Sequence, residues 1–198
     1  MMSEKEFWSI IDLLDWKHQG NDKKVLAPAI KALASKSKTE ICRFEERFAY
    51  LLYQLDTKAH ASNIGEDSYD PASDYVSADG FLCARCVVVA NGREFYESVL
   101  KDPTKMVKDM EFESLLGLAS GSYELKTGEE FEYSTGSSYE SFSNPAGWRG
   151  ESITKACSWP GRLFWFSELQ CHCRRPRQLS LGVRRLNYYF AWIPGSWR

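Results

Sequence analysis

Hydrophobic residues recur at helical spacing at the start of the chain. Ser3 precedes Glu6 by three residues, the spacing of a capping box, in which a hydroxyl and a carboxylate each satisfy a free helix amide. Apolar residues then follow at intervals of three and four: Phe7, Ile10, Ile11 and Leu14. This pattern predicts a first helix that begins at once and continues until the turn formers Gly20-Asn21-Asp22.

Two more helices are predicted in the first third of the chain. The second covers residues 25–34 and has Pro28 in its first turn, the one place where a helix tolerates proline. The third follows another capping box, Ser37 with Glu40, and extends to about Thr57. Its apolar residues form one continuous face: Ile41, Phe44, Phe48, Leu51, Leu52 and Leu55.

The middle of the chain contains a nearly continuous apolar run over residues 81–90. A buried helix and a buried strand both fit a run of that length. We favour a helix, with Asp79 as the N-cap and Asn91-Gly92 as the stop. Further helices are predicted over residues 93–101 and 110–126, where apolar residues again recur at helical spacing.

Two acidic loops separate these helices. Residues 61–80 are rich in turn formers and hold five carboxylates and no base, and residues 127–148 hold four carboxylates among aromatic residues, again without a base. Several helices joined by polar loops, with little strand signal, predict an all-α fold in a single compact multi-helix domain. A hydrophobic content of 43% is typical of a folded globular protein.

The near-neutral net charge of −2 is the difference between two unlike parts of the chain. Residues 1–148 hold 25 acidic and 16 basic side chains, a balance of −9, whereas residues 149–198 hold two acidic and nine basic ones, a balance of +7. We expect the domain to cover residues 1–166. The basic, aromatic tail at 167–198 is interpreted as a functional arm, as an ordinary terminal helix, or as a non-native or disordered end acquired by frameshift or recombination.

Several motifs between residues 3 and 130 resemble a bacterial family known as domain of unknown function 4240. They include the opening Phe7-Trp8-Ser9-Ile10-Ile11, and then Asp79-Gly80-Phe81, Gly92-Arg93-Glu94-Phe95-Tyr96, Leu100, Asp102-Pro103, Glu113, Ala119, Tyr123 and Gly128-Glu129-Glu130. The resemblance implies a small bacterial helical domain, and the family has no established activity. The chain departs from the family at residues 82–87, where such proteins usually have an aromatic residue and a tryptophan, and the tail does not resemble it.

The sequence favours a cytoplasmic location. No stretch approaches the roughly 18 to 20 consecutive apolar residues that a membrane span needs, and the first residues are acidic where a signal peptide would be basic. No membrane partner is therefore expected. The six cysteines are expected to be reduced thiols, because there is no export signal.

A zinc site is a weak candidate. Cys83 and Cys86 together with Cys171 and Cys173 supply four soft ligands, the number that tetrahedral zinc takes. Against this, Cys83 and Cys86 lie inside an apolar run, where cysteine acts as a small hydrophobic residue. A redox role for this pair is equally weak, and no cofactor is expected.

Catalytic motifs are missing from the sequence. It contains no nucleotide-binding glycine motif, zinc-protease motif or serine-hydrolase elbow. The three histidines, His18, His60 and His172, are expected to be solvated at helix ends. The adjacent acids Glu45-Glu46 and Glu129-Glu130 would suggest a carboxylate-dependent enzyme only if a cleft lay between them, since adjacent acids on a helix usually face water.

Nucleic-acid binding is an alternative that depends on the tail. Arginines and aromatic residues alternate there in a pattern that neutralises phosphates and stacks bases: Arg174, Arg175, Arg177, Arg184 and Arg185, followed by Tyr188, Tyr189, Phe190 and Trp192. The acidic remainder of the chain would repel the same ligand. These residues could also pair with the chain's own acidic loops.

The leading hypothesis is a non-enzymatic protein-binding domain. Carboxylates in the two loops would steer a basic protein partner and tyrosines would anchor it, as in an immunity-type protein that neutralises a basic toxin. The candidate contact residues are Asp67, Tyr69, Asp70, Asp74, Tyr75, Glu129, Glu130, Glu132, Tyr133 and Tyr139. The alternative is that both loops are simply solvated.

Overall fold

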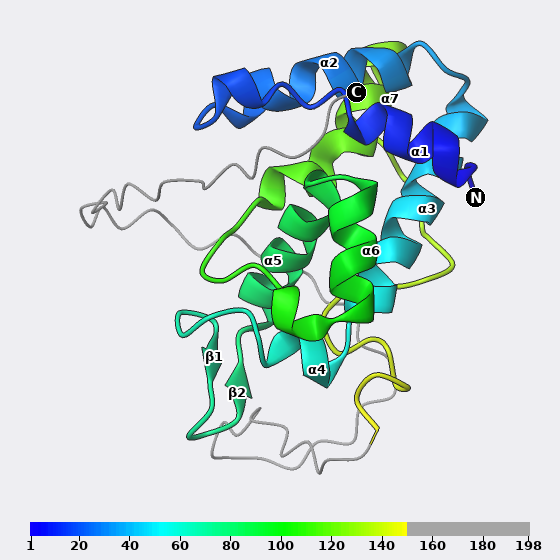
Figure 1. Cartoon of the computed structure of the whole chain (residues 1–198). Coiled ribbons are helices and arrows are strands. Elements are labelled where there is room, and N and C mark those ends of the chain that lie inside the picture. Colours follow the sequence, from blue (N-terminus) through cyan, green and yellow to red (C-terminus); the bar gives the residue numbers. More distant parts are fainter. Residues whose placement is uncertain (150–198) are drawn as a thin grey trace, which may run out of the picture. The chain divides into compact units, whose positions relative to one another are not determined.

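The computed structural model describes residues 1–149, and these form a mostly helical domain (Figure 1). The first half contains four helices: α1 (Glu4–Ile11), α2 (Asp22–Ala34), α3 (Lys38–Leu55) and α4 (Lys58–Ala61). A two-stranded antiparallel hairpin follows, β1 (Tyr69–Asp70) and β2 (Tyr75–Val76). The second half contains α5 (Ala78–Ala90), α6 (Arg93–Lys101) and α7 (Leu118–Thr127). The all-α prediction is confirmed, with this short hairpin as the one sheet among the described residues.

Helix α5 is the centre of the core, and every residue from Gly80 to Ala90 is buried. The apolar run is therefore a helix, as favoured from its flanking residues, and it is buried because α3 and α6 both pack against it. Its N-cap is Ser77, whose hydroxyl accepts a hydrogen bond from the Gly80 amide at 3.2 Å. The predicted cap, Asp79, lies instead in the first turn, where a negative charge is favourable to the helix dipole.

Aromatic packing joins α1 to α3. The rings of Phe7 and Phe44 stack with centroids 4.8 Å apart, and the Phe48 ring stacks with both at 6.4 Å. The predicted capping box of α3 is present, because the hydroxyl of Ser37 and the carboxylate of Glu40 each accept a backbone amide. The apolar faces that the sequence predicts for the first and third helices therefore pack together in one core.

The first two helices differ from their predicted bounds. Helix α1 ends at Ile11, because Asp15 caps a separate 3-10 turn with its side chain and its amide bonds to Val25 across the chain. Helix α2 begins earlier than predicted, because Asn21 accepts the Lys24 amide. Pro28 thus lies inside α2 rather than in its first turn, where its missing amide removes one helical hydrogen bond.

Two further boundaries were wrong. The third helix ends at Leu55, and Thr57 caps the short α4 instead of closing α3. The helix predicted over residues 110–126 cannot start at 110, because Asp109 has a φ of +52° and the backbone of Phe112 is not helical, with a φ of −147° and a ψ of 61°. A 3-10 turn (Glu113–Gly117) precedes α7 there. The domain end predicted near residue 166 and the tail at 167–198 lie outside the described residues.

Candidate functional site

The second acidic loop runs along helix α3 rather than projecting into solvent. We call residues 128–148 the strap. Glu129 pairs with Lys38 at the start of α3 at 3.0 Å, and the Tyr133 hydroxyl donates to Glu46 in its middle at 2.8 Å. At its far end the Asn144 amide donates to Asp56, just beyond α3. The strap therefore follows the whole length of α3, which Figure 1 shows as the yellow chain beside the helix.

Asp56 holds the end of the strap. Its fully buried carboxylate accepts four hydrogen bonds: from the Phe142 amide at 3.0 Å, the Ser143 hydroxyl at 3.3 Å, the Asn144 amide at 2.9 Å and the Trp148 indole at 2.9 Å. A buried carboxylate is stable only when donors surround it in this way. Asp56 is accordingly the residue that fixes the strap to the helical core.

Arg85 supports the same region from α5. Its side chain is completely buried, donates to the Leu52 carbonyl and the Ser141 hydroxyl at 2.9 Å each, and stacks over the Phe81 ring. Burial lowers the pKa of Arg85, and the Asp56 carboxylate acts in the opposite direction. Arg85 and Asp56 thus both hold the strap to the core, through Ser141 and through residues 142–148.

A pocket of about 270 Å³ lies between α3 and the strap. Its floor includes Glu45, which is 7% exposed and whose Oε2 has no hydrogen-bond partner among residues 1–149. Burial, and secondarily the neighbouring Glu46, raises the pKa of Glu45 to about 7. The prediction that both of these adjacent acids face water was wrong for Glu45. Its spacing from Ile41 and Leu52 already placed it on the apolar stripe of the helix.

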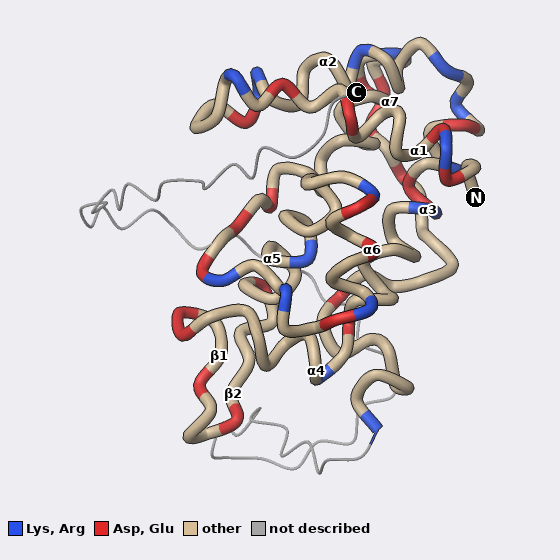
Figure 2. The backbone as a smooth tube through the Cα atoms, viewed as in Figure 1, with Lys and Arg blue, Asp and Glu red and all other residues tan. Residues whose placement is uncertain are grey.

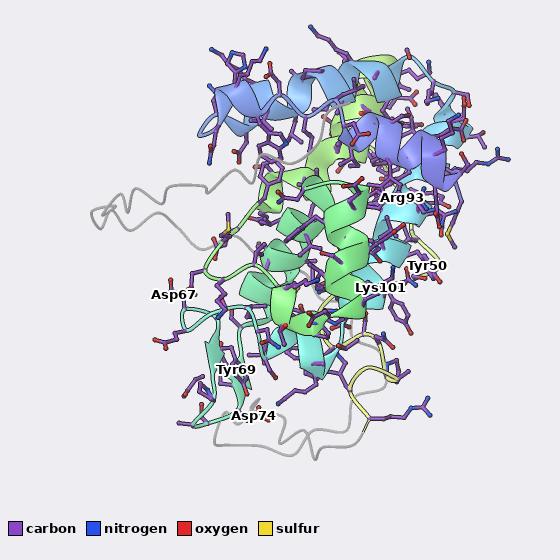
Figure 3. All side chains as sticks on the ribbon, in the orientation of Figure 1. Tyr50, Asp67, Tyr69, Asp74, Arg93 and Lys101 are labelled. Atoms are coloured by element: carbon purple, nitrogen blue, oxygen red, sulfur yellow. The ribbon has the colours of Figure 1, made fainter. Side chains whose placement is uncertain are left out.

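The first acidic loop contains the β1–β2 hairpin, which carries Tyr69, Asp70, Asp74 and Tyr75, and Asp67 comes just before it. Figure 3 labels Asp67, Tyr69 and Asp74. Asp74 pairs with Lys58 and accepts the Tyr69 hydroxyl at 3.3 Å. The Ser73 hydroxyl, and then the Ala72 amide, hold the pKa of Asp70 below its usual value. The Tyr75 side chain is 57% exposed. Figure 2 shows acidic segments along this hairpin and no basic one.

A second pocket, of about 300 Å³, opens beside the hairpin. Three carboxylates line it, Asp67, Asp109 and Glu111. Asp109 fixes its shape, because its Oδ1 accepts the Asp67 amide at 3.1 Å and lies where a side chain on Gly65 would begin. Sequence reasoning missed Asp109 and Glu111, which come more than 30 residues after the hairpin, and it placed Glu111 inside the helix predicted over residues 110–126.

The ten predicted contact residues fall into two groups rather than one surface. The hairpin group lies by Lys58, beyond the end of α3, whereas Glu129 lies at the start of that 18-residue helix, which spans about 27 Å. In the strap group, Glu129 and Tyr133 bind the chain's own α3, and Glu130 and Glu132 are exposed. The strap group also includes Tyr139, which lines the strap pocket.

The cysteine pair on α5 faces the protein interior. Cys83 and Cys86 are both buried, and burial raises the pKa of Cys83 to about 11 and raises that of Cys86. Within residues 1–149 no group of three or more histidine, cysteine or acidic side chains is arranged to hold a metal ion. The other two zinc candidates, Cys171 and Cys173, lie outside the described residues.

Of the two histidines in the described part of the chain, one differs from the sequence prediction. His18 is exposed and contacts Asp15, as expected for a helix-end histidine. His60 is buried, with Nδ1 2.7 Å from the Thr57 hydroxyl and Nε2 3.2 Å from the Val99 carbonyl, and burial lowers its pKa. It therefore has a structural role joining α4 to α6. His172 lies outside the described residues.

The fold and these two sites define a small, mostly helical domain with an acidic pocket beside a hairpin and a second carboxylate pocket beneath a strap. The chain matches the protein family of unknown function DUF4240 over residues 2–140 and belongs to that family. No curated protein and no solved structure matches the chain. Within residues 1–149, none of the helices combines the length and apolar character that crossing a bilayer requires.

Proposed function

We propose that this domain is a non-enzymatic protein-binding domain and that its hairpin binds a basic protein partner. The observation that supports this proposal is the acidic pocket beside the hairpin. Asp67, Asp109 and Glu111 line this pocket, and among the described residues none of them forms an ion pair with a lysine or arginine. A lysine or arginine side chain of a partner has the size and charge to enter it.

The surface around the pocket has the other features of a protein interface. Tyr75 projects from the hairpin with more than half of its surface exposed, and tyrosines of this kind are frequent energetic anchors. Glu66 and Asp79 add carboxylates that form no ion pair within residues 1–149. Residues 1–148 hold more acidic than basic side chains, and this negative charge attracts a basic partner at long range and raises its association rate.

The finer proposal is that the partner is a basic toxin and that the domain is an immunity-type inhibitor. An acidic protein that covers a basic active cleft blocks it with the same carboxylates that attract it. In this proposal the hairpin enters the cleft, and Tyr75 packs against its wall. The partner's activity should then fall in proportion to the amount of complex formed.

Charge reversal at two sites tests the proposal. The full chain is immobilised and exposed to lysate from cells that produce it, next to a hairpin variant, Glu66→Lys with Asp67→Lys, and a strap variant, Glu130→Lys with Glu132→Lys. Both variants change the net charge equally at exposed positions. We expect a basic protein that the wild type and the strap variant retain and the hairpin variant loses by at least tenfold.

Three outcomes are decisive. Equal loss in both variants would mean that binding follows overall charge rather than the hairpin, and retention by both would reject the hairpin as the interface. For the immunity proposal, the captured protein is assayed for cell killing with and without the domain, and undiminished killing by a saturated complex rejects it. The nucleic-acid alternative depends on tail residues outside those described and stays a prediction.

A further inference from the structure

Glu45 is a buried acid without a hydrogen-bond partner in the described part of the chain. Its side chain lies on α3 beneath the strap, 93% shielded from solvent, and among the described residues neither of its oxygens takes part in a hydrogen bond. Leaving a buried carboxylate unpaired is costly, whereas the other buried acid of this region, Asp56, is surrounded by four donors. The local packing therefore leaves a vacant acceptor at the floor of the strap pocket.

The rest of the strap pocket, as far as the described residues line it, is polar and lacks a cation. Five hydroxyl groups and a second carboxylate surround the opening: Tyr133, Ser134, Thr135, Ser138, Tyr139 and Glu140. No described lysine, arginine or histidine lines it. The Glu140 carboxylate does interact electrostatically with Arg85, but that guanidinium is already hydrogen-bonded to Leu52 and Ser141.

We propose that the strap pocket binds a small organic cation, a primary ammonium or a guanidinium, whose N–H groups donate to Glu45. The cation would supply the hydrogen bonds and the opposite charge that Glu45 lacks. The hydroxyls of Ser134, Thr135 and Ser138 would accept its remaining donors, and the tyrosine rings provide faces on which a cation is stabilised. A volume of about 270 Å³ limits the ligand to the size of a diamine or a free amino acid.

Binding is expected to be linked to the ionisation of Glu45. The charged and titratable groups near it are Glu46 and Cys42 from α3, Cys86 from α5, and Tyr133, Tyr139 and Glu140 from the strap. Since its pKa is about 7, Glu45 holds a proton below that pH and cannot pair with a cation. Affinity should therefore fall about tenfold per pH unit below 7 and level off above it.

The test is calorimetric titration of the full chain with agmatine, which carries both cationic groups, and with glucose as a neutral polyhydroxyl probe. Titrations are run at pH 6 and pH 8 on the wild type, on Glu45→Gln and on Glu124→Gln, which changes an exposed acid on α7. We expect agmatine to bind more tightly at pH 8, Glu45→Gln to weaken it by at least tenfold, and Glu124→Gln to change it less than twofold.

Amide chemical shifts of the strap, recorded in the same titrations, locate the bound probe and show whether Glu45→Gln keeps the wild-type fold. Unchanged strap shifts with agmatine at 10 mM would overturn the proposal, as would glucose binding in preference to agmatine. Equal affinity in a folded Glu45→Gln variant would overturn it as well. The hairpin variants of the protein-binding test leave this pocket intact, so the two proposals can fail separately.

Discussion

Replacing Asp56 with asparagine should release the end of the strap. The substitution keeps the size of the side chain but converts one acceptor oxygen to a donor, which then faces two of the four groups that hydrogen-bond to Asp56. Hydrogen bonds to a charged group contribute about 1.5–3 kcal/mol each, so the loss of two corresponds to roughly 3–6 kcal/mol. Because a freed strap lets some of these donors reach water, we expect the free energy of unfolding to fall by about 4 kcal/mol and the Tm to fall by roughly 8–16 °C.

The measurement is urea unfolding followed by far-UV circular dichroism, with hydrogen exchange of residues 142–148 in the native state. Asp67→Asn is the matched control, because it removes the same charge from an exposed side chain and should change stability by less than about 0.5 kcal/mol. We expect exchange at residues 142–148 to accelerate in Asp56→Asn alone. If the free energy of unfolding of Asp56→Asn lies within about 1 kcal/mol of that of the control, and these amides exchange as slowly as in the wild type, Asp56 does not hold the strap.

Three further predictions concern Glu45, Gly147 and the cysteine pair. Because the pKa of Glu45 rises from 4.5 to about 7 on folding, its contribution to stability is fully present below pH 4.5 and is lost as the pH rises through 7. Glu45→Gln should therefore be more stable than the wild type by up to about 3 kcal/mol at pH 8 and equally stable at pH 4.5. A difference in urea unfolding that does not depend on pH would contradict this. A Cβ on Gly147 would come within 2.6 Å of the Asp56 carbonyl oxygen, so Gly147→Ala should lower the stability measured by thermal unfolding by about 2 kcal/mol. Gly117→Ala is the control, because a Cβ there meets no described atom within 4 Å and should change the stability little. Equal effects of the two substitutions would exclude the steric explanation. Alkylation at pH 8, read by peptide mass spectrometry, should leave Cys83 and Cys86 unmodified until urea is added, and fast native labelling would show that α5 is not buried.

Most helices of the domain could be predicted from sequence, because their signals are local. Caps such as Ser37 lie three residues from the amides they satisfy, and apolar residues three or four apart share a face. The misplaced boundaries come from contacts that local patterns do not contain. Helix α1 stops where Asp15 bonds to Val25, and α3 stops where Asp56 turns its carboxylate to a strap almost 90 residues later.

The residues of the candidate sites also divide into those with a local signal in the sequence and those without one. Sequence identified the two acidic loops and their tyrosines, but it treated them as equivalent. The structure separates an exposed hairpin from a strap whose Tyr133 and Glu129 bind the chain's own helix. Glu45 had a local signal, its place on the apolar stripe of α3, whereas Asp109 had none.

The sequence by itself determined the helical class of this protein, the membership of its first 140 residues in a family, and the uneven distribution of charge along the chain. Each of these follows from composition or from residues a few positions apart. Only the tertiary structure decided which acids are exposed, paired or buried. Carboxylates are alike in sequence, and their chemistry depends on donors, cations and solvent brought to them by segments far away in the chain.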